Sequence, residues 1–239
     1  MNESLYRLVS WGFQELIWGG DLLGVDNLPE RGPAVFVSNH LGALGPIAVG
    51  ASLPLRLHAW IHADMLDPHL ASDYLRRDFV EPQLHVPSPF SRWLAEAISK
   101  IHVPLLRAVG GIPVYHTAHG LLETFRLSVD LLAQGEYLLI FPEDFDQPID
   151  ERYQMAPFQK GFTRLGELYY ERTRQILPFY PLAVHKLSFT VRVGRPIRYN
   201  PMVNPLSERV RLKNLLEQSV HELYLQALLD EIIQLPLPN

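Results

Sequence analysis

The sequence contains no cysteine, which excludes disulfide bonds and catalysis by a cysteine thiolate. It has no block of five or six Lys and Arg residues, and its formal net charge is -5, so the basic surface of a nucleic-acid-binding protein is missing. No run of about 18 unbroken apolar residues is present, which argues against a membrane-spanning helix. The start lacks the pattern of a signal peptide. We therefore expect a cytoplasmic protein with no nucleic-acid partner, either free or lying on the inner face of the membrane.

The sequence does contain alternating strand and helix patterns over most of its 239 residues. Short apolar runs of strand length alternate with longer stretches of helical periodicity, which is typical of an α/β fold. We expect a mixed, mostly parallel sheet flanked by helices, in one domain over residues 21–239. The predicted strands are 34–38, 55–61, 110–115, 137–141, 176–184 and 188–193, and the predicted helices are 89–108, 117–133, 161–173 and 204–233.

Residues 1–20 are predicted to carry a short amphipathic helix, because polar residues recur over residues 4–18 at spacings of three and four. Such a helix is too short to cross a bilayer, but it can lie in the membrane interface or pack on its own domain. Few Lys or Arg residues lie on its polar side, which weakens the interaction with anionic headgroups. The sequence leaves both interpretations open.

Two later helices carry apolar residues at helical spacing, for which packing against the core is the ordinary interpretation. In residues 89–108 these include Trp93, predicted to be core or interface bulk, and Ile101. In the last helix the predicted core-facing residues are Val210, Leu215, Leu216, Val220, Leu223 and Leu228.

Three predicted strands end in residues that can carry chemistry: Asn39-His40, Tyr115-His116 and Pro142-Glu143. In open α/β sheets, ligands bind beyond the carboxyl ends of the strands, so these ends can converge on one site. His40 is the natural general base, because the ordinary pKa of histidine lies close to neutral pH. A histidine at a strand end is also a common structural feature, so His40 alone does not establish catalysis.

An ordered series of motifs resembles the lysophosphatidate and glycerol-phosphate acyltransferase family, the PlsC type. The series covers roughly residues 22–200, and its order and spacing are more specific than any one motif. It consists of GVDNLPERGPAVFVSNH, which ends at His40, followed by GGIPVYH (Gly110–His116), IFPED (Ile140–Asp144), PFQKGF (Pro157–Phe162), ILPFYPLAV (Ile176–Val184) and VRVGRPI (Val191–Ile197).

This resemblance implies transfer of a fatty acyl group from a coenzyme A or acyl-carrier-protein thioester to a lipid-like acceptor at a membrane surface. It implies that His40 takes the proton of the acceptor and that a nearby carboxylate orients the imidazole. The carboxylate candidates are Glu143, Asp144 and Asp146. No bound cofactor and no metal ligand are expected, since the acyl thioester is a co-substrate. The predicted substrate-binding residues are Asn39, Gly111, Ile112, His116, Pro142, Lys160 and Arg164, of which Lys160 and Arg164 could face a phosphate of coenzyme A.

The sequence departs from the family pattern at three places. The family places an Asp five residues after the histidine, where this chain has Gly45. The second motif ends in His116 instead of Arg, and the third continues with Asp144 and Asp146 instead of residues that end in Arg. Carboxylates repel a phosphate in a pocket of low dielectric, so a glycerol-phosphate acceptor is not expected. Two interpretations follow: an acyltransferase with a different acceptor, or an inactive homologue that binds lipid or a partner.

A third interpretation rests on different chemistry. His58, Trp60, His62 and Asp64 alternate, so a strand would place all four on one face. Two histidines and one carboxylate can form a metal site, which would make the protein a metal enzyme. The spacing is common by chance among ten histidines, and a buried or surface role for these residues is the ordinary alternative.

Overall fold

The apolar stretch predicted to be a buried strand, Ala34–Ser38, is strand β2 in the computed structural model of the protein, and all five residues are buried. The structure describes residues 18–42, 44–82, 84–115 and 117–234. Within these residues the chain divides into two compact units. The smaller unit comprises residues 58–128, and the larger comprises residues 18–57 and 129–234.

The larger unit contains a mixed sheet with the strand order β1-β7-β6-β2-β5, and β8 pairs with β6. Strand β2 is parallel to both of its neighbours, β5 and β6, and β1 is parallel to β7. Strand β6 is antiparallel to β7 and β8. The strands are β1 (Asp21–Leu23), β2, β5 (Tyr137–Ile140), β6 (Pro178–His185), β7 (Thr190–Val193) and β8 (Ile197–Arg198). The predicted α/β fold with a mixed, mostly parallel sheet flanked by helices is confirmed.

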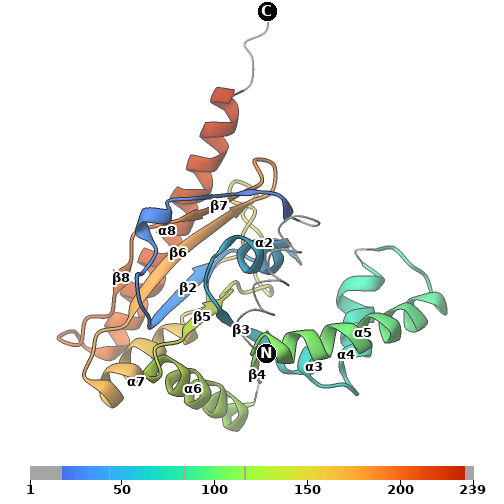
Figure 1. Ribbon diagram of the computed structural model, residues 1–239, viewed down its shortest axis with the longest axis horizontal. Helices are drawn as coiled ribbons and strands as arrows, with labels where there is room; N and C mark the ends of the chain where they lie inside the picture. The colour runs from blue at the N-terminus through green and yellow to red at the C-terminus, as the bar shows by residue number, and fades with distance from the viewer. Residues whose placement is uncertain (1–17, 43, 83, 116, 235–239) are drawn as a thin grey trace, which may run out of the picture. The chain divides into compact units, whose positions relative to one another are not determined.

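Helices cover this sheet because its central strands are apolar on both faces. Helices α2 (Leu44–Ser52) and α8 (Pro205–Gln234) both contact β6 and β7. Figure 1 shows α8 passing behind the sheet and α2 in front of it. The remaining helical segments of this unit are η2 (Val25–Asn27), η4 (Gly161–Thr163) and α7 (Arg164–Thr173).

The last helix begins as predicted, and the predicted core-facing residues Leu216 and Val220 are buried. Oδ1 of Asn204 accepts hydrogen bonds from the backbone N–H groups of Leu206 (3.0 Å) and Ser207 (3.4 Å), as an N-cap residue does. The buried residues are Leu212, Leu216, Val220, Tyr224 and Ala227, at spacings of three and four. Val210 and Leu215 were predicted to face the core, but they are exposed, because the stripe that meets the sheet lies on the other side of them.

The smaller unit combines a pair of parallel strands with a group of helices. Strand β3 pairs with β4, with Trp60 opposite Ile112. The helices include most of residues 63–89, which the sequence pattern does not assign. The elements are β3 (Leu57–His62), α3 (Ala63–Leu66), α4 (Ala71–Leu75), the π-helical turn η3 (Arg76–Val80), α5 (Phe90–Ala108) and β4 (Ile112–Val114).

Helix α5 confirms the predicted helix over residues 89–108, and Trp93, predicted to be core or interface bulk, lies outside the core. Ser91, Ala95, Ser99 and Val103 are its buried residues. Trp93 and Ile101 are each 73% exposed. Helical periodicity identified this apolar row, but the smaller unit packs against another side of the helix, where Leu94 and Ile98 join the core.

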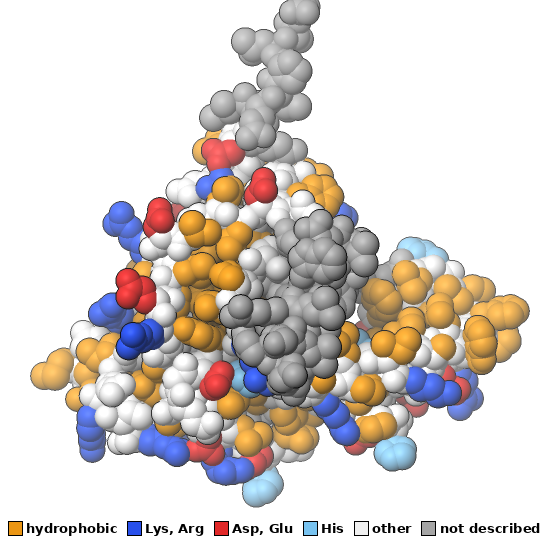
Figure 2. All heavy atoms as spheres, in the orientation of Figure 1, with side chains coloured by type: hydrophobic (Ala, Val, Ile, Leu, Met, Phe, Trp, Pro, Cys, Tyr) orange, Lys and Arg blue, Asp and Glu red, His pale blue; other side chains and the backbone are white. Residues whose placement is uncertain are grey.

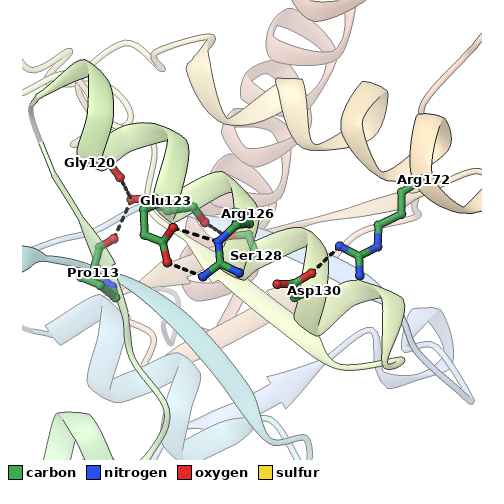
Figure 3. A network of polar contacts seen from close by, with 8 residues as sticks. Pro113, Gly120, Glu123, Arg126, Ser128, Asp130 and Arg172 are labelled. Atoms are coloured by element: carbon green, nitrogen blue, oxygen red, sulfur yellow. Dashed lines mark hydrogen bonds and ion pairs between the residues drawn. The ribbon is translucent and has the colours of Figure 1, made fainter.

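Helix α6 (Ala118–Ala133) includes residues of both units, and polar contacts follow its length. Arg126 donates two hydrogen bonds to Glu123, one turn earlier, and Asp130 forms an ion pair with Arg172 of α7 (Figure 3). The Glu123–Arg126 pair is exposed and therefore adds little to the free energy of unfolding.

The amphipathic helix predicted over residues 4–18 lies outside the described residues, apart from Trp18. Trp18 is buried, and its ring centroid lies 5.7 Å from that of Phe189 in the larger unit. Among the described residues, no helix is long and apolar enough to cross a membrane.

Candidate functional site

The carboxyl ends of β2 and β5 bring His40 and Glu143 together. The two strands are parallel, and Val37 of β2 lies opposite Ile140 of β5. His40 follows Val37 by three positions, and Glu143 follows Ile140 by three positions. Because parallel strands end on the same edge of a sheet, the register alone places the two residues side by side. The predicted convergence of these two strand ends is therefore observed within the larger unit.

Glu143 holds the backbone at this edge instead of the imidazole ring. Its Oε1 accepts a hydrogen bond from the backbone N–H of His40 at 2.5 Å, and its Oε2 accepts one from the backbone N–H of Ala156 at 2.9 Å. Glu143 is only 7% exposed, and this burial raises its pKa, while the two N–H donors act in the opposite direction. The Glu143 carboxylate thus links the backbone at His40 to the backbone at Ala156. The position of Glu143 in the IFPED motif did not predict this link.

The imidazole of His40 is packed between two aromatic rings. The centroid of Phe141 lies 5.1 Å away and that of Phe145 5.5 Å away, both in nearly perpendicular orientations. The ring atom Nδ1 is buried and has no hydrogen-bond partner among the described residues. Burial lowers the pKa of His40 below the ordinary 6.5, and a backbone contact with Gly42 opposes part of that shift. This shift favours the neutral ring, which is the state a general base requires.

Gly45, at the position where the family has its Asp, leaves no room for a side chain. The backbone N–H of Gly45 donates to the carbonyl oxygen of His40 at 3.0 Å. A Cβ atom at residue 45 would lie 2.2 Å from that same oxygen and 2.7 Å from its carbon. Such distances require the backbone to move, so an aspartate could not enter this site without rearranging the loop after β2.

Asp144 and Asp146 lie in the turn that follows Glu143. Oδ1 of Asp144 accepts a hydrogen bond from the backbone N–H of Asp146 at 3.4 Å, and the side chain of Asp146 is exposed. The described contacts of these two carboxylates do not include the ring of His40. Phe145, between them, does contact that ring, and the sequence patterns did not single it out.

The segment containing Lys160 is fixed beside this edge through its backbone. The backbone N–H of Gln159 donates to the carbonyl of Pro142 at 2.8 Å, and that of Asp144 donates to Pro157 at 2.9 Å. Lys160 itself is exposed, and Arg164 begins α7 in a half-buried position. The segment that contains Lys160 thus lies near the predicted site, and the Lys160 side chain is exposed to solvent.

Asn39 supports the sheet directly. Its Nδ2 donates to the carbonyl of Val184 at 2.9 Å, and its Oδ1 accepts from the N–H of the same residue at 2.7 Å. This pair of bonds extends the pairing of β2 with β6 by one residue. Because its amide groups are already bonded, Asn39 contributes to the site chiefly by fixing the backbone that carries His40.

The described residues of the GGIPVYH motif, 110–115, lie in the smaller unit. Gly111 and Ile112 differ in their surroundings. Ile112 is 2% exposed and belongs to the core. Gly111 lines a depression of about 480 Å³. The depression is also lined by Asp64, Asp67, Arg107 and Tyr115 among others. His116, predicted to bind substrate, lies outside the described residues.

The predicted alternation of His58, Trp60, His62 and Asp64 along one strand is wrong. Strand β3 ends at His62, and Asp64 belongs to α3, where its backbone N–H donates to Nδ1 of His62 at 3.3 Å. In the part of the chain that the structure describes, no three His, Asp or Glu side chains come together as metal ligands. The interpretation as a His/Asp metal enzyme therefore loses its geometric basis.

Comparison with known structures finds a solved acyltransferase of similar fold. The crystal structure of the 1-acyl-sn-glycerophosphate (LPA) acyltransferase PlsC from Thermotoga maritima aligns with a TM-score of 0.56 and 12% identity, over 92% of this chain and 82% of that one. The chain therefore has a PlsC-like fold. No protein-family model matches the sequence, and no curated protein matches it. At this identity the PlsC-like fold is what the comparison establishes.

Proposed function

We propose that this PlsC-like protein transfers an acyl group from a thioester to a neutral, lipid-like acceptor, with His40 as the proton acceptor. The observation that supports this most directly is an imidazole fixed through its backbone by a buried glutamate, at the carboxyl ends of two parallel strands. Burial lowers the pKa of His40, which favours the neutral ring. Because no carboxylate among the described residues contacts the ring, its orientation comes from Phe141 and Phe145.

In the proposed reaction the acceptor oxygen attacks the thioester carbonyl carbon while its proton passes to the imidazole of His40. The carbon–sulfur bond then breaks, and the imidazolium returns the proton to the departing thiolate. The donor is an acyl thioester of coenzyme A or acyl carrier protein, for which Lys160 is an exposed cation beside the site. The half-buried Asp144 carboxylate, next to Glu143 in sequence, disfavours a phosphate-bearing acceptor by repulsion, so we do not expect glycerol phosphate or lysophosphatidate as substrates.

A second function, binding of an acyl lipid without turnover, is favoured by the surroundings of Nδ1. That atom is buried without a partner among the described residues, and residue 45 has no side chain to supply one. Loss of the orienting carboxylate in a histidine–carboxylate pair costs on the order of 10⁴ in rate in the well-studied serine protease case. A site with this deficit would bind an acyl lipid without transferring the acyl group.

The deciding experiment measures thiol release and product mass for the wild-type protein with acyl-CoA and acyl-ACP donors. The acceptors are a fatty alcohol, a monoacylglycerol, a lysolipid with a neutral or cationic headgroup, and lysophosphatidate as the control for phosphate. If His40 is the base, His40→Ala lowers kcat/KM by about 10²–10⁴. Unchanged turnover in this variant would remove His40 from the mechanism, whereas bound acyl lipid without turnover in the wild type would support the second function.

The pH profile supplies an independent check on the same residue. The base must be neutral, so kcat/KM should rise with pH through the folded pKa of His40, which lies below 6.5, and stay level above it. Lysophosphatidate turnover at rates equal to those of neutral acceptors would contradict the proposed acceptor class. A rise centred above pH 6.5 would point to a different titrating group.

A further inference from the structure

Helix α5 presents a wide apolar stripe to solvent. Phe90 is 68% exposed, and Trp93 and Ile101 are 73% exposed each. Ala97 and Pro104, also exposed, complete a row with spacings of three and four, so that all five share one face of the helix. Figure 2, in the orientation of Figure 1, shows hydrophobic side chains gathered over this part of the smaller unit.

The core of the smaller unit lies on the other side of the helix. There Ala95 packs with Leu75 and Val80, and Ser91 donates a hydrogen bond to Glu81 at 2.8 Å. An ordinary surface helix turns its large apolar residues inward and its small or polar ones outward. Helix α5 packs Leu94 and Ile98 against that core, but it also carries a second row of large apolar residues on its outer face, which predicts that something apolar covers that face.

Positive charge accompanies this stripe. Trp93, Lys100 and Arg107 follow one another at intervals of seven residues, so the two cations lie along one edge of the apolar row. The helix carries Arg92, Lys100 and Arg107 against Glu96, a net charge of three minus one, or +2, in a chain whose net charge is -5. The guanidinium of Arg107 is held in place by a hydrogen bond from its Nε to the carbonyl of Leu66 at 2.8 Å.

We infer that the exposed stripe of α5, formed by Phe90, Trp93, Ala97, Ile101 and Pro104, docks on an anionic lipid bilayer. Tryptophan and phenylalanine on one face with cations at its edge are the features of helices that lie in the membrane interface. Trp side chains prefer the headgroup level, and each Lys or Arg near an anionic surface adds attraction. The local positive charge favours an anionic bilayer over a second copy docked through the same stripe, because a two-fold contact would bring the Lys and Arg residues of both helices together. This inference does not rest on the proposed acyl transfer.

The test is sedimentation of the full chain with vesicles of phosphatidylcholine containing phosphatidylglycerol, compared with vesicles of phosphatidylcholine alone. The variant is Trp93→Ser combined with Ile101→Ser. The matched control is Met202→Ser combined with Leu206→Ser, because those residues are 89% and 68% exposed but lie in the larger unit. We expect the α5 variant to need about tenfold more lipid for half-maximal binding, and the control to bind like the wild type.

Two further measurements show whether the α5 stripe itself meets the bilayer. Vesicles should shift the tryptophan emission of the wild type to shorter wavelength, and Trp93→Phe should bind equally well but show a smaller shift. Lys100→Glu should weaken binding to the anionic vesicles and leave binding to phosphatidylcholine unchanged. Vesicle binding by the α5 variant equal to that of the wild type would overturn the inference. So would a lipid-free dimer that this variant converts to a monomer, because a second copy would then cover the stripe.

Discussion

The strand edge at His40 and the outer face of α5 use their side chains in opposite ways. At the strand edge the polar side chains of Glu143 and Asn39 are buried and bonded to backbone groups of distant segments. On α5 Phe90, Trp93 and Ile101 are exposed to solvent, although other residues of the helix pack against the core. In the first region Glu143 and Asn39 find their partners within the same unit, whereas the second region presents apolar side chains without a described partner. The difference indicates that changes at the edge should affect folding, and that changes on α5 should affect association.

The largest effect is expected from Gly45→Asp, which would restore the acid of the family motif. Because a Cβ at residue 45 would lie 2.2 Å from the carbonyl oxygen of His40, the loop must move. We expect the free energy of unfolding to fall by about 3 kcal/mol or more, with no gain of activity. Urea denaturation measures this change. The matched control is Gly50→Ala in the same helix, where a Cβ meets no atom within 4 Å, and we expect it to stabilise by about 0.5–1 kcal/mol. A stable Gly45→Asp protein with higher turnover would contradict the prediction.

Glu143→Ala should have the next largest effect. The variant leaves the buried N–H groups of His40 and Ala156 without acceptors, and each such loss costs about 1–3 kcal/mol. We expect a decrease of about 3 kcal/mol in the free energy of unfolding, measured by urea denaturation. Asp146→Ala, an exposed carboxylate in the same turn, should change it by less than about 0.5 kcal/mol. Equal effects of the two variants would mean that Glu143 is not a backbone anchor.

The smallest effect on folding is expected from Trp93→Ser on α5. Its side chain is already 73% exposed in the folded chain, so its removal should change the free energy of unfolding by less than about 0.5 kcal/mol. Leu75→Ala, on the side that packs against α5, should cost about 2–3 kcal/mol through lost burial and a cavity. Thermal and urea denaturation of both variants measure the contrast. A large loss in Trp93→Ser would show that the outer face of α5 contributes to the fold itself.

Much of the fold was predictable from local patterns. The apolar runs at β2, β5 and β6 could be recognised because buried parallel strands are apolar on both faces, and Asn204-Pro205 marked the start of α8 through its capping chemistry. Helix α2 was missed, since its sequence LGPIAVGAS contains two glycines and a proline and lacks a helical repeat. The sequence pattern located the apolar row of α5 that includes Trp93 and Ile101, but it did not show whether that row faces the core or solvent. Periodicity locates an apolar face without saying which neighbour covers it.

The candidate site, like the fold, was predictable only in part. His40 and Glu143 could be selected from the sequence because they follow apolar strands whose ends must share one edge. The use of both Glu143 oxygens by backbone N–H groups could not be anticipated, because one of those groups belongs to Ala156, thirteen residues along the chain. The aromatic packing around the ring of His40 likewise depends on how the turn after β5 folds back.

By itself the amino-acid sequence determined which residues stand at the strand ends, that no aspartate follows His40 at the family's position, and that the chain alternates strands with helices. Tertiary structure decided how those groups are used. A carboxylate binds whichever N–H groups folding brings to it, and a helix buries whichever face its neighbours leave room for. These are properties of distances between residues far apart in the chain, which local patterns of side chains do not encode.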